Sequence, residues 1–299
     1  MKKNKSIRKP HRHRERNITH ALFVAPATLI YFVFFIIPIL WGIYYSFTNY
    51  NGISPKYDFV GLHNYITMFT NHRFGRAFWF NIRYSVALVV LTMVLSLCIA
   101  LLLNRKIRCR NFFRAVYFLP AVLSMLTIGL VFNEILTRVI PAIGLDLGID
   151  WLSKSILSSG DYAIWGVLLV HIWQGIAIPT VLFLAGLQTV PEDLYEAAAL
   201  DGASAWQKFW KITIPFLIPT LSIVFVLVLK DGLTVFDYIM AMTGGGPAGS
   251  TESVAMLIYN HGFGERKFSL AIAESIVLAT VLCLISYIQI AWSNRKKVY

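Results

Sequence analysis

The side chains that most often carry out chemistry do not form a recognisable catalytic or metal-binding set in this sequence. Cys98, Cys109 and Cys283 have no close spacing, and His171 and His261 lack partners at the intervals of metal ligands or acid–base pairs. None of the 19 glycines is followed by Lys, so the chain has no GxxxxGK[ST] phosphate-binding loop. We therefore expect this chain to have no catalytic residue, no metal site and no cofactor of its own.

Polar side chains inside apolar segments could instead contact a solute. His171, Trp173 and Gln174 fall near the middle of the apolar segment 163-187. An indole face beside an amide suits the C–H and hydroxyl groups of a sugar, so these residues are candidates for a substrate pathway, as is Asn133 in an earlier segment. The alternative is that they only bond or fill space between neighbouring helices.

Three charged residues, Lys230, Asp231 and Glu274, also lie within apolar segments. Charged groups in hydrocarbon are rare and usually paired. Because their depths agree, we predict a structural ion pair in which Lys230 contacts the neighbourhood of Asp231 or reaches Glu274 across the fifth and sixth segments. A direct role in transport is the alternative.

The composition places these side chains in a membrane protein. The 299 residues are 57% hydrophobic and 14% charged, with a mean hydropathy of +0.63, which excludes a soluble two-domain enzyme and a disordered chain. Apolar windows long enough to cross a bilayer predict an all-α protein of six transmembrane helices, with the first peripheral to a core of five. The predicted spans are about 21-47, 81-103, 115-137, 163-187, 213-238 and 268-292.

The positive charge is concentrated beside these spans. The net charge is +12, and Lys and Arg cluster in residues 1-20, in 104-114 and at 295-297. The positive-inside rule therefore predicts that both termini and the loops 104-114 and 188-212 are cytoplasmic, with 1-20 a basic tail. The clusters are short and lack interleaved aromatic residues, which argues against nucleic acid as a partner. The first apolar run is too long for a signal peptide and is expected to stay as a span.

The cytoplasmic loop 188-212 carries signals for two short helices. Thr189 is a candidate N-cap for the first, and Gly202 can end it with a positive φ. Ser204 can cap the second, in which Trp206, Phe209 and Trp210 share one face. The small residues beside Glu196 would allow another protein to approach closely, although the pair could also simply pack at the membrane surface.

The same loop resembles a known signature. Glu196-Ala197-Ala198, Gly202 and Ile212 to Pro215 resemble the EAA motif of permease subunits of bacterial ABC importers, with Ile214 where Leu is usual. The longer string from Glu196 to Leu221 is similar to the carbohydrate branch, the maltose and multiple-sugar type. Other motifs of this permease family are similar to further segments of the chain, namely 59-65, 118-120, 184-191 and 242-247 with Thr251. The last of these is typical of the larger maltose-type permease.

The resemblance implies the type I ABC importer permease fold and a transport subunit without chemistry of its own. Such a subunit would lie in a bacterial plasma membrane, pair with a second permease as a heterodimer and couple to two ATPase subunits that use ATP and Mg. An extracellular binding protein would deliver the sugar. The expected ATPase-coupling residues are Glu196, Ala197, Ala198, Asp201, Gly202, Ala203 and Phe209.

A self-contained ion-coupled secondary transporter is the alternative function. It would need coupling carboxylates near the midplane and commonly has inverted repeats. The intramembrane acids here are predicted to lie toward the outer ends of their spans, and the chain has a docking loop instead. A membrane enzyme would need the catalytic constellation that the sequence lacks.

Overall fold

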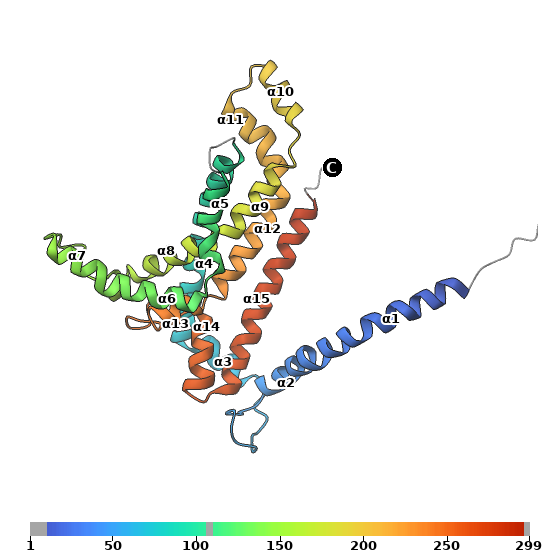
Figure 1. Ribbon diagram of the computed structural model, residues 1–299. Coiled ribbons are helices and arrows are strands. Elements are labelled where there is room, and N and C mark those ends of the chain that lie inside the picture. The colour runs from blue at the N-terminus through green and yellow to red at the C-terminus, as the bar shows by residue number, and fades with distance from the viewer. Residues whose placement is uncertain (1–10, 106–109, 296–299) are drawn as a thin grey trace, which may run out of the picture.

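The structure is a computed structural model that describes residues 11–105 and 110–295, and its regular structure there is helical (Figure 1). The one antiparallel bridge in this part of the chain joins Thr48 and Phe59. The predicted all-α class is therefore confirmed. Residues 1–10 of the basic tail lie outside the described residues, as do residues 106–109 of the loop 104-114.

Five helices and one bent helix pair are long and apolar enough to cross a membrane. Counting the bent pair as one span gives the predicted six. The spans are Leu22–Ser46, His72–Asn104, Met125–Asp146, the pair Ala163–Gly175 and Ala177–Leu187, Ala205–Leu233, and Phe268–Gln289.

The first span stands apart from the others. It consists of α1 (His11–Tyr31), a π-helical turn (Phe32–Ile36) and α2 (Ile37–Ser46), and it points away from the bundle in Figure 1. Its apolar window has no buried residue, whereas the windows of the other single-helix spans are 22–33% buried. Contact with the rest of the chain is made near its C-terminal end, where α2 packs on α15 (Phe268–Arg295). The span is peripheral, as predicted.

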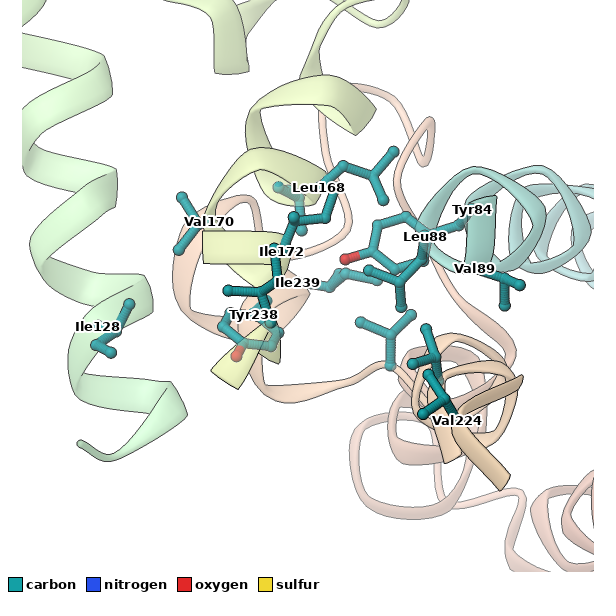
Figure 2. Close-up of a cluster of buried hydrophobic side chains, with 14 of the residues drawn as sticks. Tyr84, Leu88, Val89, Ile128, Leu168, Val170, Ile172, Val224, Tyr238 and Ile239 are labelled. Carbon is teal, nitrogen blue, oxygen red and sulfur yellow. The ribbon is translucent and has the colours of Figure 1, made fainter. Parts of the chain in front are cut away.

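The core forms where α4 (His72–Asn104) crosses α8 (Ala163–Gly175), α9 (Ala177–Leu187) and α12 (Ile214–Leu233). Phe80, Tyr84 and Leu88 of α4 are at most 2% exposed, because a four-residue spacing places them on one helix face. Figure 2 shows Tyr84 and Leu88 among side chains of α8 and α13 (Asp237–Met242).

The predicted third span, 115-137, was wrong in its boundaries. The chain forms α5 (Arg110–Phe118), a 3-10 turn (Leu119–Val122) and then a break, after which α6 (Met125–Glu134), a π-helical turn (Ile135–Val139) and α7 (Ile140–Asp146) continue as one helix. Pro120 has no N–H to donate, and Ser124 is extended with a ψ of 131°. Hydropathy does not detect this break because apolar residues continue through it.

Two further boundaries differ from the prediction. The second span begins at His72 instead of 81, because the Asn71 side chain caps the helix by accepting a hydrogen bond from the backbone N–H of Arg73. The fifth span begins at Ala205 and ends at Leu233, where the chain turns into α13, so 234-238 are not part of it.

Short helices close the two ends of the bundle. At one end lies a hairpin of α10 (Glu192–Leu200) and α11 (Ala205–Lys208), followed by a π-helical turn (Phe209–Thr213) (Figure 1). Away from it lie α3 (His63–Thr70), a 3-10 turn (Ile156–Ser158), α14 (Val254–Tyr259) and a π-helical turn (Asn260–Gly264).

An ion-pair network joins the elements at the α3 and α14 end. Arg73 at the start of α4 donates to Glu252 at 2.6 and 2.8 Å and to Glu265 at 2.5 Å. Asn260 also donates to Glu252, at 2.9 Å. Hydrogen bonds from Lys267, and then from Arg73, hold the pKa of Glu265 below its ordinary value. The network ties α4 to the segments on either side of α14, through Glu252 before it and Glu265 after it.

The predicted ion pair is only partly as expected. Lys230 Nζ lies 3.4 Å from Asp231 Oδ1, and the two side chains are 63% and 52% exposed. Glu274 is fully buried and its Oε1 lies 2.9 Å from Nδ1 of His261. A contact between Lys230 and Glu274 was the wrong prediction, because the turn before α15 carries His261 back against Glu274.

Removal of the imidazole should therefore strand a buried carboxylate. We expect His261→Ala to lower the stability of the purified protein by about 3–5 kcal/mol, because breaking one side of a buried pair leaves the other uncompensated. Thermal unfolding in detergent measures the change. His63→Ala, at an exposed position, is the matched control. Adding Glu274→Gln to His261→Ala should restore part of the stability, and an absence of recovery would contradict the pairing.

Candidate functional site

The hairpin is shaped by backbone hydrogen bonds at a single glycine. Gly202 has a φ of +74°, which L side chains rarely adopt, and a Cβ there would meet open space. The N–H of Gly202 donates to the carbonyl of Ala199 at 3.1 Å, and that of Ala203 donates to Ala198 at 2.9 Å. These two bonds form a Schellman motif, so the predicted glycine C-cap is confirmed.

The second predicted cap is also confirmed, while the first is not. The Ser204 hydroxyl accepts from the N–H of Gln207 at 3.3 Å, and the Gln207 side chain accepts from the N–H of Ser204 at 2.8 Å, which is a capping box. Thr189 does not cap α10. Its hydroxyl donates back to the carbonyl of Gly186, because α10 begins three residues later, after an extended Pro191.

The hairpin exposes most of the residues predicted to couple. α10 has no buried residue: Glu196, Ala197, Asp201 and Gly202 are exposed, and Ala198 and Ala203 are half-buried. Leu200 is 90% exposed. Phe209 is half-buried and packs against Trp206 and Trp210, which confirms the shared aromatic face. A helix with no fully buried residue contributes little to the stability of this chain and is available to a partner.

The hairpin is firmly joined to the bundle. The hydroxyls of Tyr195 in α10 and Thr213 lie 2.8 Å apart. α11 continues through the π-helical turn into α12 without interruption. A force applied to α10 therefore reaches the fifth span through a continuous helix and a hydrogen bond.

A second group of predicted residues surrounds the bend between α8 and α9, which turn by 47°. The Gln174 amide donates to the carbonyl of Leu123 at 2.8 Å and accepts from the Tyr238 hydroxyl at 2.7 Å. Leu123 ends the 3-10 turn before the break, so its carbonyl has lost a helical partner. Gln174 thus satisfies interrupted backbone.

His171 belongs to the same buried polar group. Its Nδ1 lies 2.9 Å from the Tyr84 hydroxyl, and its ring stacks on Tyr238 with centroids 4.5 Å apart. The side chain of Asn133 donates to the carbonyl of Met242. The amide groups of Gln174 and Asn133 and the ring of His171 therefore each contact a neighbouring helix or its end.

Trp173 faces another way. It is 43% exposed, its ring packs on Phe132 with centroids 5.3 Å apart, and it lines a cavity of about 680 Å³ together with Trp165 and aliphatic side chains of α4 and α8. Of the four residues predicted for a substrate pathway, Trp173 is the one that lines this cavity.

Several hydrogen bonds between helices were not predicted from the sequence. The Asn81 amide donates to the carbonyl of Leu233 at 2.6 Å and accepts from the N–H of Val254 at 2.9 Å, so it joins the ends of two helices. Tyr84 and Tyr238 complete the polar group at the bend. Asn81 and Tyr84 lie on the side of α4 that carries Phe80 and Leu88. Two polar residues on an otherwise apolar helix face were the feature of the sequence that could have indicated these contacts.

Within residues 11–105 and 110–295, no three His, Cys, Asp or Glu side chains gather closely enough to hold a metal ion.

Most of the chain matches a known protein family. Residues 92–299 match the family described as binding-protein-dependent transport system inner membrane component. The chain belongs to this family. The predicted resemblance to ABC importer permeases is confirmed, and the chain is therefore a permease component of a transport system.

Relatives and solved structures agree with this assignment. The permease is 42% identical over 276 residues to the multiple sugar-binding transport system permease protein MsmF of Streptococcus mutans, covering 92% of this chain and 95% of the relative. It is 31% identical to the probable starch degradation products transport system permease protein AmyD of Thermoanaerobacterium thermosulfurigenes, covering 95% and 97%.

A solved structure supports the fold independently. It is a bacterial ABC transporter involved in the import of the acidic polysaccharide alginate, and it superposes with a TM-score of 0.79 at 21% identity. The match covers 95% of this permease and 99% of that chain. At this identity the likeness confirms the importer permease fold.

The contacts of Gln174 generate a stability prediction. We expect Gln174→Leu to destabilise the permease by about 1–3 kcal/mol for each group left unpaired, because the Leu123 carbonyl and the Tyr238 hydroxyl would both lose a partner in an apolar setting. Tyr238→Phe, which removes only one bond, should have a smaller effect. Gln188→Leu, at an exposed position, is the matched control, and an equal melting temperature for Gln174→Leu and Gln188→Leu would contradict the assignment.

Proposed function

We propose that this permease carries a saccharide or saccharide derivative across a bacterial plasma membrane, driven by ATP hydrolysis in partner subunits. The observation that carries the proposal is the hairpin, since α10 has no fully buried residue and Leu200 is 90% exposed. The absence of a phosphate-binding loop from the sequence is consistent with ATP and Mg being bound elsewhere.

The hairpin is the proposed seat of an ATPase. Two ATPase copies would serve a pair of permeases, one on each hairpin. Glu196, Leu200 and the alanines beside them would enter a groove on the ATPase, with Gly202 setting the angle between the two helices. The positive charge around 104-114 and at the chain ends supports a cytoplasmic position for both termini and for the hairpin.

A second permease is the proposed partner within the membrane. The first span has no buried residue in its apolar window and projects from the bundle (Figure 1). Lipid alone could cover an apolar helix, but a heterodimer would also cover the exposed faces of the core helices. The pair would enclose the pathway between them.

The substrate class rests on two observations. The relatives that are similar over nearly their whole lengths are named for multiple sugars and starch degradation products. Trp173 lines a cavity with a second indole, Trp165, and such rings stack on the C–H faces of sugars. An extracellular binding protein would deliver the saccharide. In this proposal Trp173 contacts substrate, while His171, Gln174 and Asn133 hold the helices that position it.

Co-purification tests the proposal. The tagged permease is isolated from its native membrane as wild type and as the double variant Glu196→Ala/Gly202→Asp. We expect an ATPase and a second permease to accompany the wild type. The ATPase should be depleted by about tenfold or more in the variant, which corresponds to about 1.4 kcal/mol of lost docking free energy.

The control uses the same backbone strain at a distant site. Gly148 has a φ of +68° with open space around it, so Gly148→Asp imposes a similar strain outside the hairpin and should retain the ATPase. A permease that arrives alone and still takes up substrate would refute the proposal.

A further inference from the structure

A cleft beside the first turns of α4 has no role in the functions assigned so far. It has a volume of about 490 Å³. Arg76, Trp79, Phe80 and Arg83 of α4 line one wall, and the residues 247–250, Ser158 and Gly160 line the other. The volume lies within the range of about 300–1,000 Å³ for clefts that hold small ligands or side chains.

The α4 wall carries two positive charges without a counter-charge. Arg76 and Arg83 are seven residues apart, so they lie on the same helix face about 10.5 Å apart along the axis. Among the described residues neither has a carboxylate partner, and the lining contains no Asp or Glu. Arg73 on the preceding turn differs, since it binds both Glu252 and Glu265. The cleft is thus cationic.

The opposite wall presents an unused hydroxyl. The loop is fixed by Thr251, whose hydroxyl donates to the carbonyl of Gly246 at 2.7 Å and lies 2.8 Å from that of Thr243. Ser250 Oγ is buried in the permease and has no hydrogen-bond partner. Buried hydroxyls are nearly always bonded, so this group is free to donate to a ligand in the cleft.

We infer that this cleft binds an acidic segment of the extracellular binding protein, an inference that rests on the proposed function. Guanidinium groups bind carboxylates with two parallel hydrogen bonds, and the Ser250 hydroxyl can donate a third. The arginines precede the apolar run of α4 that begins at Tyr84, and α4 starts directly after α3 at the end of the bundle away from the hairpin (Figure 1). In the proposed orientation this is the side from which a binding protein approaches.

The spacing of the two arginines favours a protein over a lipid. Lipid phosphates lie at one depth, whereas Arg76 and Arg83 are separated along the helix axis by two turns. An acidic segment that runs along α4 can reach both. A neutral saccharide has no charge to satisfy either of them.

The test measures how the reconstituted transporter responds to its binding protein. ATP hydrolysis is recorded as a function of binding-protein concentration for wild type and for Arg76→Gln/Arg83→Gln. We expect the half-maximal concentration to rise by about tenfold or more with an unchanged maximal rate, because charge-assisted bonds of the docked state are lost. The salt dependence of the half-maximal concentration should also weaken.

Three further variants make the result specific. Lys154→Gln removes a charge from the neighbouring cavity and should leave the half-maximal concentration unchanged. Arg76→Lys/Arg83→Lys keeps both positive charges and should bring the half-maximal concentration part of the way back to the wild-type value. Gly160→Val obstructs the cleft with both arginines intact, because a Cβ at 160 lies 3.8 Å from Ser250 Oγ, and it should raise the half-maximal concentration.

Each outcome decides the inference. An unchanged response in Arg76→Gln/Arg83→Gln overturns it while leaving the proposed function in place. A loss that follows the content of anionic lipid in the vesicles, and not the binding-protein concentration, also overturns it and assigns the cleft to headgroups. A wild-type transporter that no binding protein stimulates refutes the proposed function itself.

Discussion

Hydrocarbon offers no hydrogen bond to a backbone carbonyl that has lost its helical partner, and this permease interrupts its helices within its apolar segments. Two of these interruptions are matched by a side chain from another helix. Gln174 bonds the carbonyl of Leu123, and Asn81 bonds the carbonyl of Leu233 and the N–H of Val254. The positions of α6, α8, α12 and α14 depend on these bonds, because a carbonyl left unpaired would destabilise the bent arrangement.

These bonds distinguish residues that hold neighbouring helices together from a residue that can face a solute, although the two kinds cannot be told apart in the sequence. His171, Trp173 and Gln174 lie within four positions of one another. The helical rotation between them directs His171 and Gln174 toward Tyr84 and Tyr238, and Trp173 toward a cavity. Polar side chains near the centre of a span can thus stabilise the bend while an aromatic neighbour remains available to a solute.

Much of the architecture could be predicted from local patterns. Apolar length gave six spans, and Gly202 and Ser204 marked the elbow of the hairpin because their capping bonds are made within five residues. The break at Leu123 was missed because apolar residues continue across it. The partners of Glu274 and His171 required contacts that only the fold creates: His171 bonds Tyr84, 87 residues away. The exposure of Trp173 depends on helix rotation in the folded bundle.

The uninterrupted helix from Ala205 to Leu233 has a mechanical consequence. At 1.5 Å per residue its 29 residues form a rod about 44 Å long. Near the far end of this rod a Cβ at Gly232 would lie 2.8 Å from Oγ and 2.9 Å from Cα of Ser85, so the glycine lets α12 and α4 approach more closely than a larger residue would allow. Such a contact can serve as a fulcrum. A displacement of a few ångströms at the hairpin would then appear as rotation about Gly232, with the largest movement at the hairpin end and little translation near Asn81.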